Sequence, residues 1–306
     1  MKTQLFLIIM ICLSIFLSGC DEKENNTKQP IIIEGKGEYV TINQAITHAS
    51  ENDTIIIPEG TYFESISLNI SFLRLIGNNP NNTIISGNNS GDVIHVSANN
   101  VTISGIQIVD SGNGAYDAGI YVHASDVNIT NTIIKNCFHG VYLHQDTKNT
   151  TIKDNTFSKT QNGVYGIQSK NNTILNNTFS ENKQYGIYIR FYSDQNKIVN
   201  NSFYNNDVGI RVKSSLYNLI SHNQVIDSLD RGIYVCCGAE DNIFYKNVFI
   251  NNSVNAYDSH DNTWYFNETG NYWDDYEGID ANNDDIGDEP YQISGGAIDN
   301  YPLLSI

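Results

Sequence analysis

Basic residues are scarce in this chain: 17 lysines and arginines stand against 34 aspartates and glutamates, so its 306 residues carry a formal net charge of −17. Proteins that bind nucleic acid need a basic face that releases counterions from the phosphates. The composition therefore argues against a nucleic-acid partner. The length suffices for one sizeable hydrophobic core.

Cysteine is also rare, and two of the five cysteines belong to the amino-terminal apolar segment and its end. The other three are Cys137, Cys236 and Cys237. Three cysteines cannot form a disulfide framework. On one strand Cys236 and Cys237 are expected to point to opposite faces, and Cys137 lies too far along the chain to bond with them. We expect all three to be packed or idle thiols.

Long apolar runs are limited to the amino terminus. Leu5–Phe16 is an apolar run of a length typical of a secretory signal and too short to span a bilayer. The run ends in LSGC, which resembles the lipobox of prokaryotic lipoproteins. That resemblance implies a signal peptide at residues 1–19, a lipid on Cys20 and a flexible tether at residues 20–37. An ordinary signal peptide with an incidental cysteine is the alternative.

The sequence repeats itself with a period of about 23 residues. Glycines that open apolar-alternating runs follow at spacings of 21, 23, 23, 23 and 23: Gly119, Gly140, Gly163, Gly186, Gly209 and Gly232. Asparagines of an N-x-[FIV] pattern follow at spacings of 24, 22, 24, 22 and 24: Asn131, Asn155, Asn177, Asn201, Asn223 and Asn247. Such a period indicates a solenoid, either leucine-rich repeats or a parallel β-helix. The core residues are Ile, Val and Phe in short runs, which favours three strands per coil and an all-β parallel β-helix of about nine coils.

The repeat explains both the abundant asparagine and the apolar residues. Turns recur about 4.8 Å apart in successive coils, where buried asparagine amides can form a hydrogen-bonded ladder. Many of the other asparagines, as in KNN and DQN, are expected at exposed turns, because asparagine tolerates the left-handed backbone. Two of the expected inward columns are Ile152, Ile174, Ile198, Ile220 and Ile243, and Phe157, Phe179, Phe203 and Phe249.

Both ends of the repeat array carry cap-like sequences. Thr41 to Gln44 forms a capping box that opens TINQAITHAS, which predicts a short capping helix within a cap and first strand at residues 38–60. This opening and the closing segment GNYWDDYEGIDANNDDIGDEPYQISGGAIDNYPL resemble NosD-type and pectate-lyase-like surface proteins. The resemblance implies a single-stranded right-handed β-helix at residues 61–269 and an acidic cap at residues 270–306. That superfamily includes sugar-binding proteins, sugar hydrolases, lyases and epimerases, and a copper-site accessory protein.

The second position after each repeat glycine is expected to point outward. It holds tyrosine in most coils, and the fourth position adds basic residues on two adjacent coils. We call the whole set the tyrosine–arginine strip: Tyr121, Tyr142, Tyr165, Tyr188, Arg190, Arg211, Lys213 and Tyr234. Sugar rings lie on aromatic faces and basic groups bind carboxylate or sulfate, so the strip predicts a surface for an extended polysaccharide. Strand propensity and self-stacking of tyrosine are the alternative explanation.

Asp207 and Asp230 form the candidate catalytic pair. Each stands two residues before its repeat glycine, which places them one coil, or about 5 Å, apart, near the spacing in retaining glycosidases. Aspartate is also a common turn residue, so a structural role stays open. The sequence GIRVK faintly resembles a polygalacturonase motif, but the paired-aspartate and GHG motifs that should precede it are absent. We therefore do not assign the polygalacturonase mechanism to this chain.

His123 and His144 share an outward column on adjacent coils, with His95 one coil before them. Imidazoles at that spacing could ligate copper or zinc, and solvated surface histidines are the alternative. The family resemblance raises the question of copper. The only methionines, Met1 and Met10, belong to the signal segment, so thioether ligands for Cu(I) are missing.

A calcium-binding loop is predicted near the carboxy terminus, and calcium is the one cofactor that the sequence suggests. Its ligands would be side-chain oxygens and one carbonyl at alternate positions: Asp280, Asn282, Asp284, Ile286 and Asp288. The position where an EF-hand has glutamate holds Tyr291, so the loop is not an EF-hand. An acidic, solvated turn is the alternative.

These patterns predict a lipid-anchored extracytoplasmic protein, at the cell surface or in the periplasm, that binds or organises polysaccharide without catalysis. We expect a monomer whose only contact with a membrane is its lipid. One alternative is a polysaccharide lyase, hydrolase or epimerase that uses Asp207 and Asp230. The other is a NosD-type copper-accessory protein.

Overall fold

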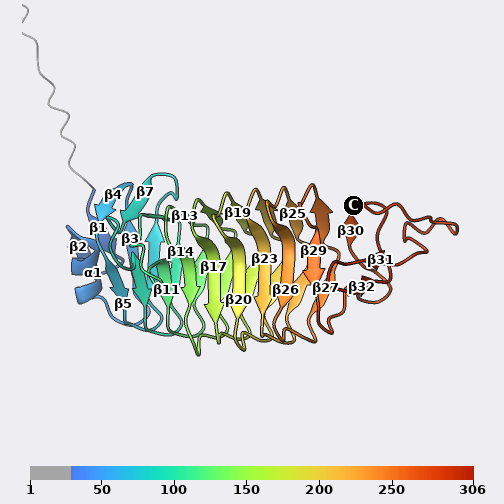
Figure 1. Ribbon diagram of the computed structural model, residues 1–306. Helices are drawn as coiled ribbons and strands as arrows, with labels where there is room; N and C mark the ends of the chain where they lie inside the picture. The colour runs from blue at the N-terminus through green and yellow to red at the C-terminus, as the bar shows by residue number, and fades with distance from the viewer. Residues whose placement is uncertain (1–28) are drawn as a thin grey trace, which may run out of the picture.

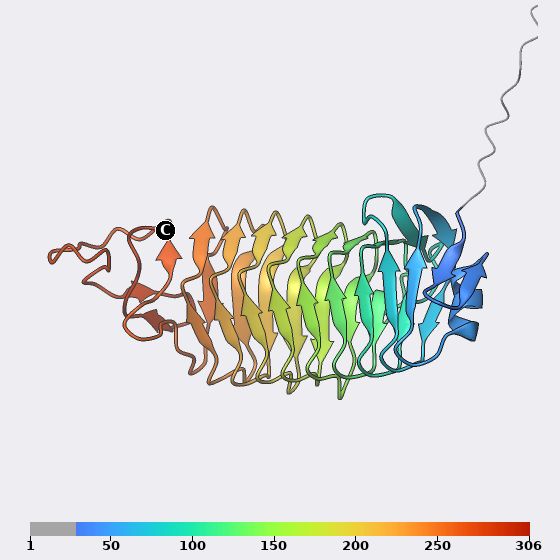
Figure 2. The ribbon, with the colours of Figure 1, turned by 180° about the vertical axis from the view of Figure 1, so that it is seen from behind.

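The computed structural model describes residues 29–306, so the predicted signal peptide, Cys20 and the start of the predicted tether lie outside the described residues. The chain winds into an elongated stack of coils, with a helix at the amino-terminal end and irregular loops at the other (Figure 1). The view from behind shows the same stack (Figure 2). Within the described residues, no helix is long and apolar enough to cross a membrane.

Equivalent strands of successive coils form three long sheets. In spatial order, sheet A contains β2 (Gly37–Tyr39), β1 (Ile31–Ile33), β3 (Thr54–Ile57), β6 (Arg74–Gly77), β9 (Thr102–Ser104), β12 (Asn128–Thr130), β15 (Thr151–Lys153), β18 (Thr173–Leu175), β21 (Lys197–Val199), β24 (Leu219–Ser221) and β27 (Ile243–Tyr245). Sheet B contains β30 (Tyr272–Trp273), β28 (Val248–Ile250), β25 (Gln224–Ile226), β22 (Ser202–Tyr204), β19 (Thr178–Ser180), β16 (Thr156–Ser158), β13 (Ile133–Lys135), β10 (Gln107–Val109), β7 (Thr83–Ser86) and β4 (Gly60–Phe63). Sheet C contains β29 (Ala256–Asp258), β26 (Arg231–Cys236), β23 (Val208–Lys213), β20 (Tyr185–Arg190), β17 (Asn162–Ile167), β14 (His139–Leu143), β11 (Ala118–Val122), β8 (Ile94–Val96) and β5 (Ile66–Leu68).

Pairing between successive coils is parallel, as in β17 beside β20, and only β1 pairs antiparallel with its neighbours in these three sheets. The parallel β-helix predicted from the repeat is therefore confirmed. Sheets of 9 to 11 strands make the stack slightly longer than the coil count expected from the sequence.

Helix α1 (Ile42–His48) packs on the first coil at the amino-terminal end. The side chain of Thr41 accepts a hydrogen bond from the backbone N–H of Gln44 at 3.1 Å, as the capping box predicts. The buried residues of the helix are Ile42, Ala45 and Ile46. Its apolar face thus closes the open end of the core.

Strand β1 lies within residues 20–37, which the sequence assigns to the flexible tether. Ile31 and Ile33 are buried, and β1 pairs with β3. The three consecutive isoleucines alternate between core and surface, which is the pattern of a strand. Residues 31–33 therefore belong to the folded array, although the sequence places the start of the cap at residue 38.

Apolar columns fill the interior as predicted. The rings of Phe157 and Phe179 stack with centroids 4.8 Å apart, and each such burial stabilises the fold by about 1.5–3 kcal/mol. One predicted member is wrong: Phe244, and not Ile243, pairs with Ile220. The inward residue lies two positions after the buried asparagine of each turn, and this rule selects Phe244.

Asparagine ladders bind successive coils together, and the one between sheets A and B was predicted from the repeat. The ladder between sheets A and B joins side chains at 2.9–3.1 Å: Asn155, Asn177, Asn201, Asn223, Asn247 and Asn271. A second ladder, between sheets C and A, joins Asn172, Asn196, Asn218, Asn242 and Asn262. The expectation that the asparagines of KNN and DQN are exposed is therefore wrong for Asn172 and Asn196, which are buried. Asn131, predicted to belong to the first ladder, is exposed, and Thr132 takes its place by donating to Asn155 at 2.8 Å.

Two buried tryptophans close the carboxy-terminal end of the core. Trp264 and Trp273 each stack on a phenylalanine of the preceding coil, with ring centroids 4.2 and 4.4 Å apart. Their indole N–H groups donate to Asp258 at 2.8 Å and to Asp299 at 3.0 Å. The same two carboxylates accept hydrogen bonds from the last asparagine of each ladder. The remaining strands, β31 (Tyr291–Gln292) and β32 (Ile298–Asp299), form a two-stranded antiparallel sheet.

Candidate binding surface on sheet C

The tyrosine–arginine strip lies on the outer face of sheet C. Side chains at the same repeat position occupy paired positions on neighbouring strands, so the register predicted from the repeat is confirmed. Arg190 and Lys213 form a second, parallel pair on β20 and β23. In the order of the paired strands, the central column reads Tyr121, Tyr142, Tyr165, Tyr188, Arg211 and Tyr234.

The rings of the column are not equally open to solvent. Tyr142 is 1% exposed and Tyr188 is 7% exposed, so the expectation of an open row of rings is wrong for these two. Tyr142 is packed among the rings of the neighbouring coils and stacks on His139 with centroids 5.3 Å apart. The guanidinium carbons of Arg190 and Arg211 lie 5.7 and 5.1 Å from the centroid of Tyr188. The other tyrosines of the strip are half-buried.

Arg211 lies at the centre of the half-buried part of the strip. Its guanidinium carbon is 4.6 Å from the ring centroid of Tyr234, and its Nη1 donates to the hydroxyl of Tyr185. On the preceding coil, Nη1 of Arg190 donates to the hydroxyl of Tyr165 at 3.1 Å. The sequence did not reveal Tyr185, because it precedes its repeat glycine at a position where no other coil has tyrosine.

Phe191 is a second residue that the sequence did not single out. It follows β20 with a left-handed backbone, φ 50°, and is half-buried. The guanidinium carbon of Arg190 lies 3.9 Å from its ring centroid, and Nζ of Lys213 lies 5.5 Å away. The ring of Phe191 therefore lies within cation–π distance of two basic side chains.

Three cations of the strip have no acidic partner. Among residues 29–306, Arg190, Arg211 and Lys213 form no ion pair, although other basic side chains do. The Nε atoms of Arg190 and Arg211 are buried without a hydrogen-bond partner. The chain has twice as many acidic as basic residues. These three neighbouring cations nevertheless create a local positive surface that an anion would neutralise.

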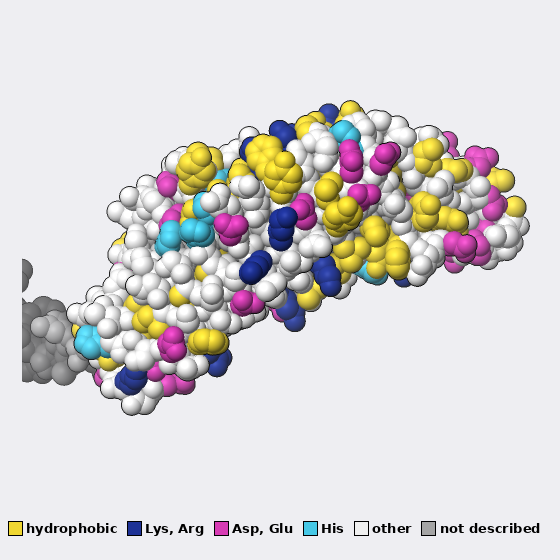
Figure 3. Space-filling view, turned by 90° about the horizontal axis from the view of Figure 1, so that it is seen from below, with side chains coloured by type: hydrophobic (Ala, Val, Ile, Leu, Met, Phe, Trp, Pro, Cys, Tyr) yellow, Lys and Arg dark blue, Asp and Glu magenta, His cyan; other side chains and the backbone are white. Residues whose placement is uncertain are grey.

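Charged side chains are unevenly spread over the molecule. On the face shown in Figure 3, lysine and arginine side chains gather toward the middle, and histidine side chains gather nearer the amino-terminal end.

Asp207 and Asp230 lie on adjacent coils, as predicted. The backbone N–H of Asp230 donates to the carbonyl oxygen of Asp207 at 2.8 Å. Burial, with a smaller effect from the neighbouring carboxylate of Asp230, raises the pKa of Asp207. The carboxylate of Asp230 forms an ion pair with Arg231. The two residues therefore lie side by side, and their catalytic role stays a prediction.

His123 and His144 are neighbours, with ring centroids 4.5 Å apart. Nδ1 of His144 is buried without a hydrogen-bond partner, and burial, followed by the nearby His123, lowers its pKa. His95 instead stacks on Tyr121 and contacts Asp92 through Nδ1 at 3.1 Å. The predicted column is confirmed, but it brings two imidazoles together and not three.

The carboxylates of the predicted calcium loop contact the loop's own backbone. Asp280 accepts hydrogen bonds from the N–H groups of Asp284 and Asp285 at 3.2 and 3.0 Å. Asp288 accepts from the N–H of Ala281 at 2.7 Å. In residues 29–306, no three His, Cys, Asp or Glu side chains form a group that could hold a metal ion. Four of the five predicted ligands, Asn282, Asp284, Ile286 and Asp288, nevertheless line one pocket. Calcium binding stays a prediction.

The expectation that Cys236 and Cys237 point to opposite faces of their strand is wrong. Their sulfurs lie 2.7 Å apart. The strand ends at Cys236, and Cys237 has a left-handed backbone, φ 62°, which turns its side chain back toward its neighbour. Cys137 is buried on a different coil, where burial raises the pKa of its thiol to about 12, as expected for a packed thiol.

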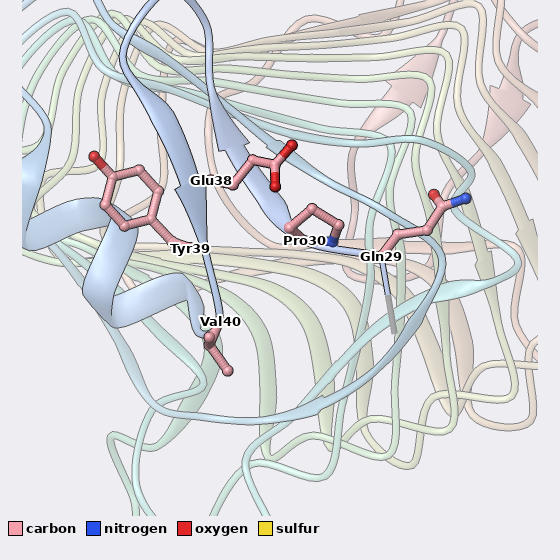
Figure 4. Close-up of a pocket in the computed structure, with 5 residues that line it drawn as sticks. All are labelled: Gln29, Pro30, Glu38, Tyr39 and Val40. Carbon is pink, nitrogen blue, oxygen red and sulfur yellow. The ribbon is translucent and has the colours of Figure 1, made fainter. Parts of the chain in front are cut away.

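A pocket of about 280 Å³ lies at the amino-terminal end of the stack, away from the strip (Figure 4). It is lined by Gln29, Pro30, Glu38, Tyr39 and Val40. Its lining holds no pair of acid–base groups and no cluster of cations. This pocket therefore does not replace the tyrosine–arginine strip as the candidate functional site.

The fold and the strip define a parallel β-helix protein with an outward aromatic and basic surface. A sequence profile described as "Periplasmic copper-binding protein (NosD)" matches residues 76–278, which is more than half of the chain. The chain belongs to the NosD family, as its ends suggested. A search of curated proteins finds no match.

Solved structures similar to this chain are β-helix proteins, which confirms the predicted right-handed fold class. Bacteriophage phi29 gene product 12 matches at TM-score 0.61 and 15% identity, over 70% of this chain and 36% of its own. Pectate lyase Pel9A matches at TM-score 0.51 and 13% identity, over 77% of this chain and 69% of its own. Alginate lyase AlyF-OU02 matches at TM-score 0.52 and 14% identity, over 85% of this chain and 65% of its own. The chain thus spans about a third of the phage protein.

The copper named in the family description does not find a complete donor set in the described residues. His123 and His144 offer two imidazoles, and Cys236 and Cys237 offer two thiols several coils away. No group of three or more ligating side chains occurs in residues 29–306. The residues present therefore do not fit a copper site built by this part of the chain alone.

Proposed function

We propose that the protein is a lipid-anchored extracytoplasmic β-helix that binds an anionic polysaccharide along the tyrosine–arginine strip without cleaving it. The LSGC sequence and the family description, which names a periplasmic protein, support the location. The parallel coils present the strip as a straight surface, which suits an extended ligand. We further propose that the protein acts as a monomer.

The observation that carries this proposal is the set of three cations without an acidic partner. Arg190, Arg211 and Lys213 lie on two adjacent coils beside half-buried aromatic rings. Guanidinium groups bind carboxylates and sulfates strongly, and the flanking rings offer faces to the apolar side of a sugar. Anionic sugars would supply the charge that the protein's own carboxylates do not.

Two of the structural relatives point to the same class of ligand. Their printed names describe lyases of pectate and of alginate, which are carboxylate-bearing polysaccharides. At 13% and 14% identity they share the fold with this chain, and the ligand class is part of our proposal.

The double variant Arg190→Gln/Arg211→Gln tests the proposal. Equilibrium binding would be measured with polygalacturonate, alginate and a neutral dextran. We expect the native protein to bind the two anionic chains and the variant to lose at least about tenfold in affinity, because each charged hydrogen bond is worth about 1.5–3 kcal/mol.

A matched control separates the strip from net charge. Lys135→Gln/Lys197→Gln removes two cations from sheets B and A, where neither lysine forms an ion pair among the described residues. It should bind like the native protein, with an unchanged melting temperature. Equal losses in both double variants would contradict a role for the strip.

Cleavage of the bound polysaccharide is the second candidate function. The juxtaposition of Asp207 and Asp230 and the raised pKa of Asp207 favour it. It predicts new reducing ends or unsaturated products that disappear in Asp207→Asn. Binding without product in the native protein would exclude it for the polysaccharides tested.

A further inference from the structure

Cys236 and Cys237 form a pair of adjacent thiols that the proposed binding function does not use. The thiol of Cys237 donates to the sulfur of Cys236, and the two sulfurs lie 2.7 Å apart. The pair stands where β26 ends and the chain turns, since Cys237 and Gly238 both have left-handed backbone, with φ of 62° and 77°. This turn holds both side chains on the same side of the chain.

The two thiols differ in access to solvent. Cys236 is 4% exposed, whereas Cys237 is exposed. Ser214 on the preceding coil donates to the carbonyl oxygen of Cys237 at 2.5 Å, which fixes the turn. An external reagent can therefore reach Cys237 first, and Cys236 is held directly behind it.

The surroundings of the pair are cationic. Nη2 of Arg211 lies 3.8 Å from the sulfur of Cys236, and Lys213 pairs with Cys236 across the sheet. Nearby cations favour the thiolate, which is the reactive form of cysteine. Tyr234 also contacts Cys236. The hydrogen bond to Cys236, followed by burial, raises the pKa of the Cys237 thiol, and the charges of Lys213 and Arg211 oppose this rise.

We propose that Cys236 and Cys237 are a redox site that closes reversibly to a vicinal disulfide when an external low-molecular-weight disulfide oxidises it. The thiolate of Cys237 attacks one sulfur of the external disulfide, which forms a mixed disulfide and releases one thiolate. The thiolate of Cys236 then attacks the sulfur of Cys237 and expels the second thiolate. The protein loses two protons and two electrons, and the external disulfide is reduced to two thiols.

The location proposed above suits this chemistry, because disulfides persist outside the cytoplasm. The other cysteine of residues 29–306, Cys137, is buried on another coil and is too far away to compete. The redox step itself does not require a bound polysaccharide, so its test is independent of the binding test.

Mass spectrometry of one peptide tests the proposal. Trypsin cuts after Arg231 and Lys246, and the peptide between them contains Cys236 and Cys237 as its only cysteines. The full protein would be reduced, exposed to glutathione disulfide, alkylated and digested. We expect the native peptide to lose two hydrogen masses, carry no alkyl group and regain both thiols on reduction.

Single variants distinguish ring closure from simple thiol modification. In Cys236→Ser, the peptide should instead retain glutathione on Cys237, because no second thiol can expel it. In Cys237→Ser, a change at an exposed position, Cys236 should form little adduct, which keeps the test valid if the buried substitution impairs folding. A native peptide that keeps a glutathione adduct, or that is alkylated at both cysteines after oxidation, would overturn the proposal.

Discussion

Asparagine has two different tasks at adjacent positions of the same turn. Asn200 is exposed and has a left-handed backbone, φ 54°. Asn201 is buried, and its Nδ2 donates to Asn223 at 3.1 Å and to the carbonyl oxygen of Ile174 at 2.9 Å. The first residue lets the chain reverse, and the second bonds one coil to the next. The repeated Asn-Asn pairs of the sequence follow from this division.

Replacing the two asparagines should therefore have different effects. Asn201→Ala leaves several buried donors and acceptors without partners, and we expect it to lower the free energy of unfolding by at least about 2 kcal/mol. Asn200→Gly keeps the left-handed backbone and should change stability by less than about 0.5 kcal/mol. Thermal unfolding of both variants would check this, and similar melting temperatures would contradict the ladder's role.

At this scale the sequence predicted both tasks and correctly placed Asn177 and Asn201 in a ladder, but it expected Asn172 and Asn196 at exposed turns. Counting along the repeat is uncertain by one residue wherever two polar residues stand together. Asn131 was assigned to the ladder for that reason, whereas Thr132 occupies it. The same one-residue uncertainty led to the prediction of Ile243 in the core, where the structure places Phe244. What distinguishes two adjacent residues of a turn is which of them is buried. That depends on the side chains of the neighbouring coils, which the local sequence does not specify.

His139 should make stability depend on pH. Its Nε2 donates to the carbonyl oxygen of Ala115 at 3.1 Å, and its Nδ1 contacts the side-chain amide of Asn162 at 3.1 Å. Burial lowers its pKa from 6.5 to about 4. Between these pH values the unfolded chain binds the proton first, so stability is lost as the pH falls through this window. The loss should reach up to about 3 kcal/mol.

Comparison with a variant isolates the histidine from other groups. Burial raises the pKa values of Asp258 and Asp299, which opposes the loss of stability on acidification. The difference in melting temperature between pH 7 and pH 4.5 should therefore be measured for the native protein and for His139→Asn. We expect a larger decrease in the native protein. An equal decrease in both would mean that His139 does not cause the effect.

At the scale of strands, the repeat glycines allow sheet C to approach the phenylalanine column. A Cβ at Gly186 would lie 2.7 Å from the carbonyl oxygen of Gly209 and 2.6 Å from Cδ1 of Phe203. Neither atom can move without disturbing the next coil. The glycines thus mark the places where sheet C lies closest to the core. The sequence showed the regular spacing of these glycines but not the close contacts that require them.

Gly186→Ala should consequently destabilise the protein. Forcing a methyl group into a packed core costs about 1–3 kcal/mol. Gly91→Asn provides a control, because Gly91 has open space around it and a left-handed backbone, φ 57°, that asparagine tolerates. Urea unfolding followed by circular dichroism would measure both variants. A Gly186→Ala midpoint that matches the native protein would contradict the close packing.

The strand scale also shows how far the binding surface could be predicted. The period placed the tyrosines and basic residues in register, because paired strands preserve spacing. It did not reveal that Tyr142 and Tyr188 are covered, since side chains of adjacent coils decide this. Tyr185 and Phe191 were not found, because neither occupies a repeated tyrosine position.

At the scale of the whole molecule, each coil contacts only its neighbours, so damage at one end should remain local. Trp273 closes the carboxy-terminal end by stacking on Phe249 and on Tyr291, with centroids 4.4 and 4.2 Å apart. Trp273→Ala should speed amide hydrogen exchange in β28 and β25 and leave β10 and β13 protected. Uniform loss of protection along the stack would contradict this local behaviour.

Binding of the native protein to a defined oligouronate series is the most direct test of the proposed function. Calorimetric titration at low and high salt would give the affinity for each chain length. We predict binding that strengthens with length until the ligand spans the coils of Arg190 and Arg211 and their flanking rings, and that weakens as salt screens the cations. Absence of binding at low salt, or equal binding to a neutral oligosaccharide, would contradict the account.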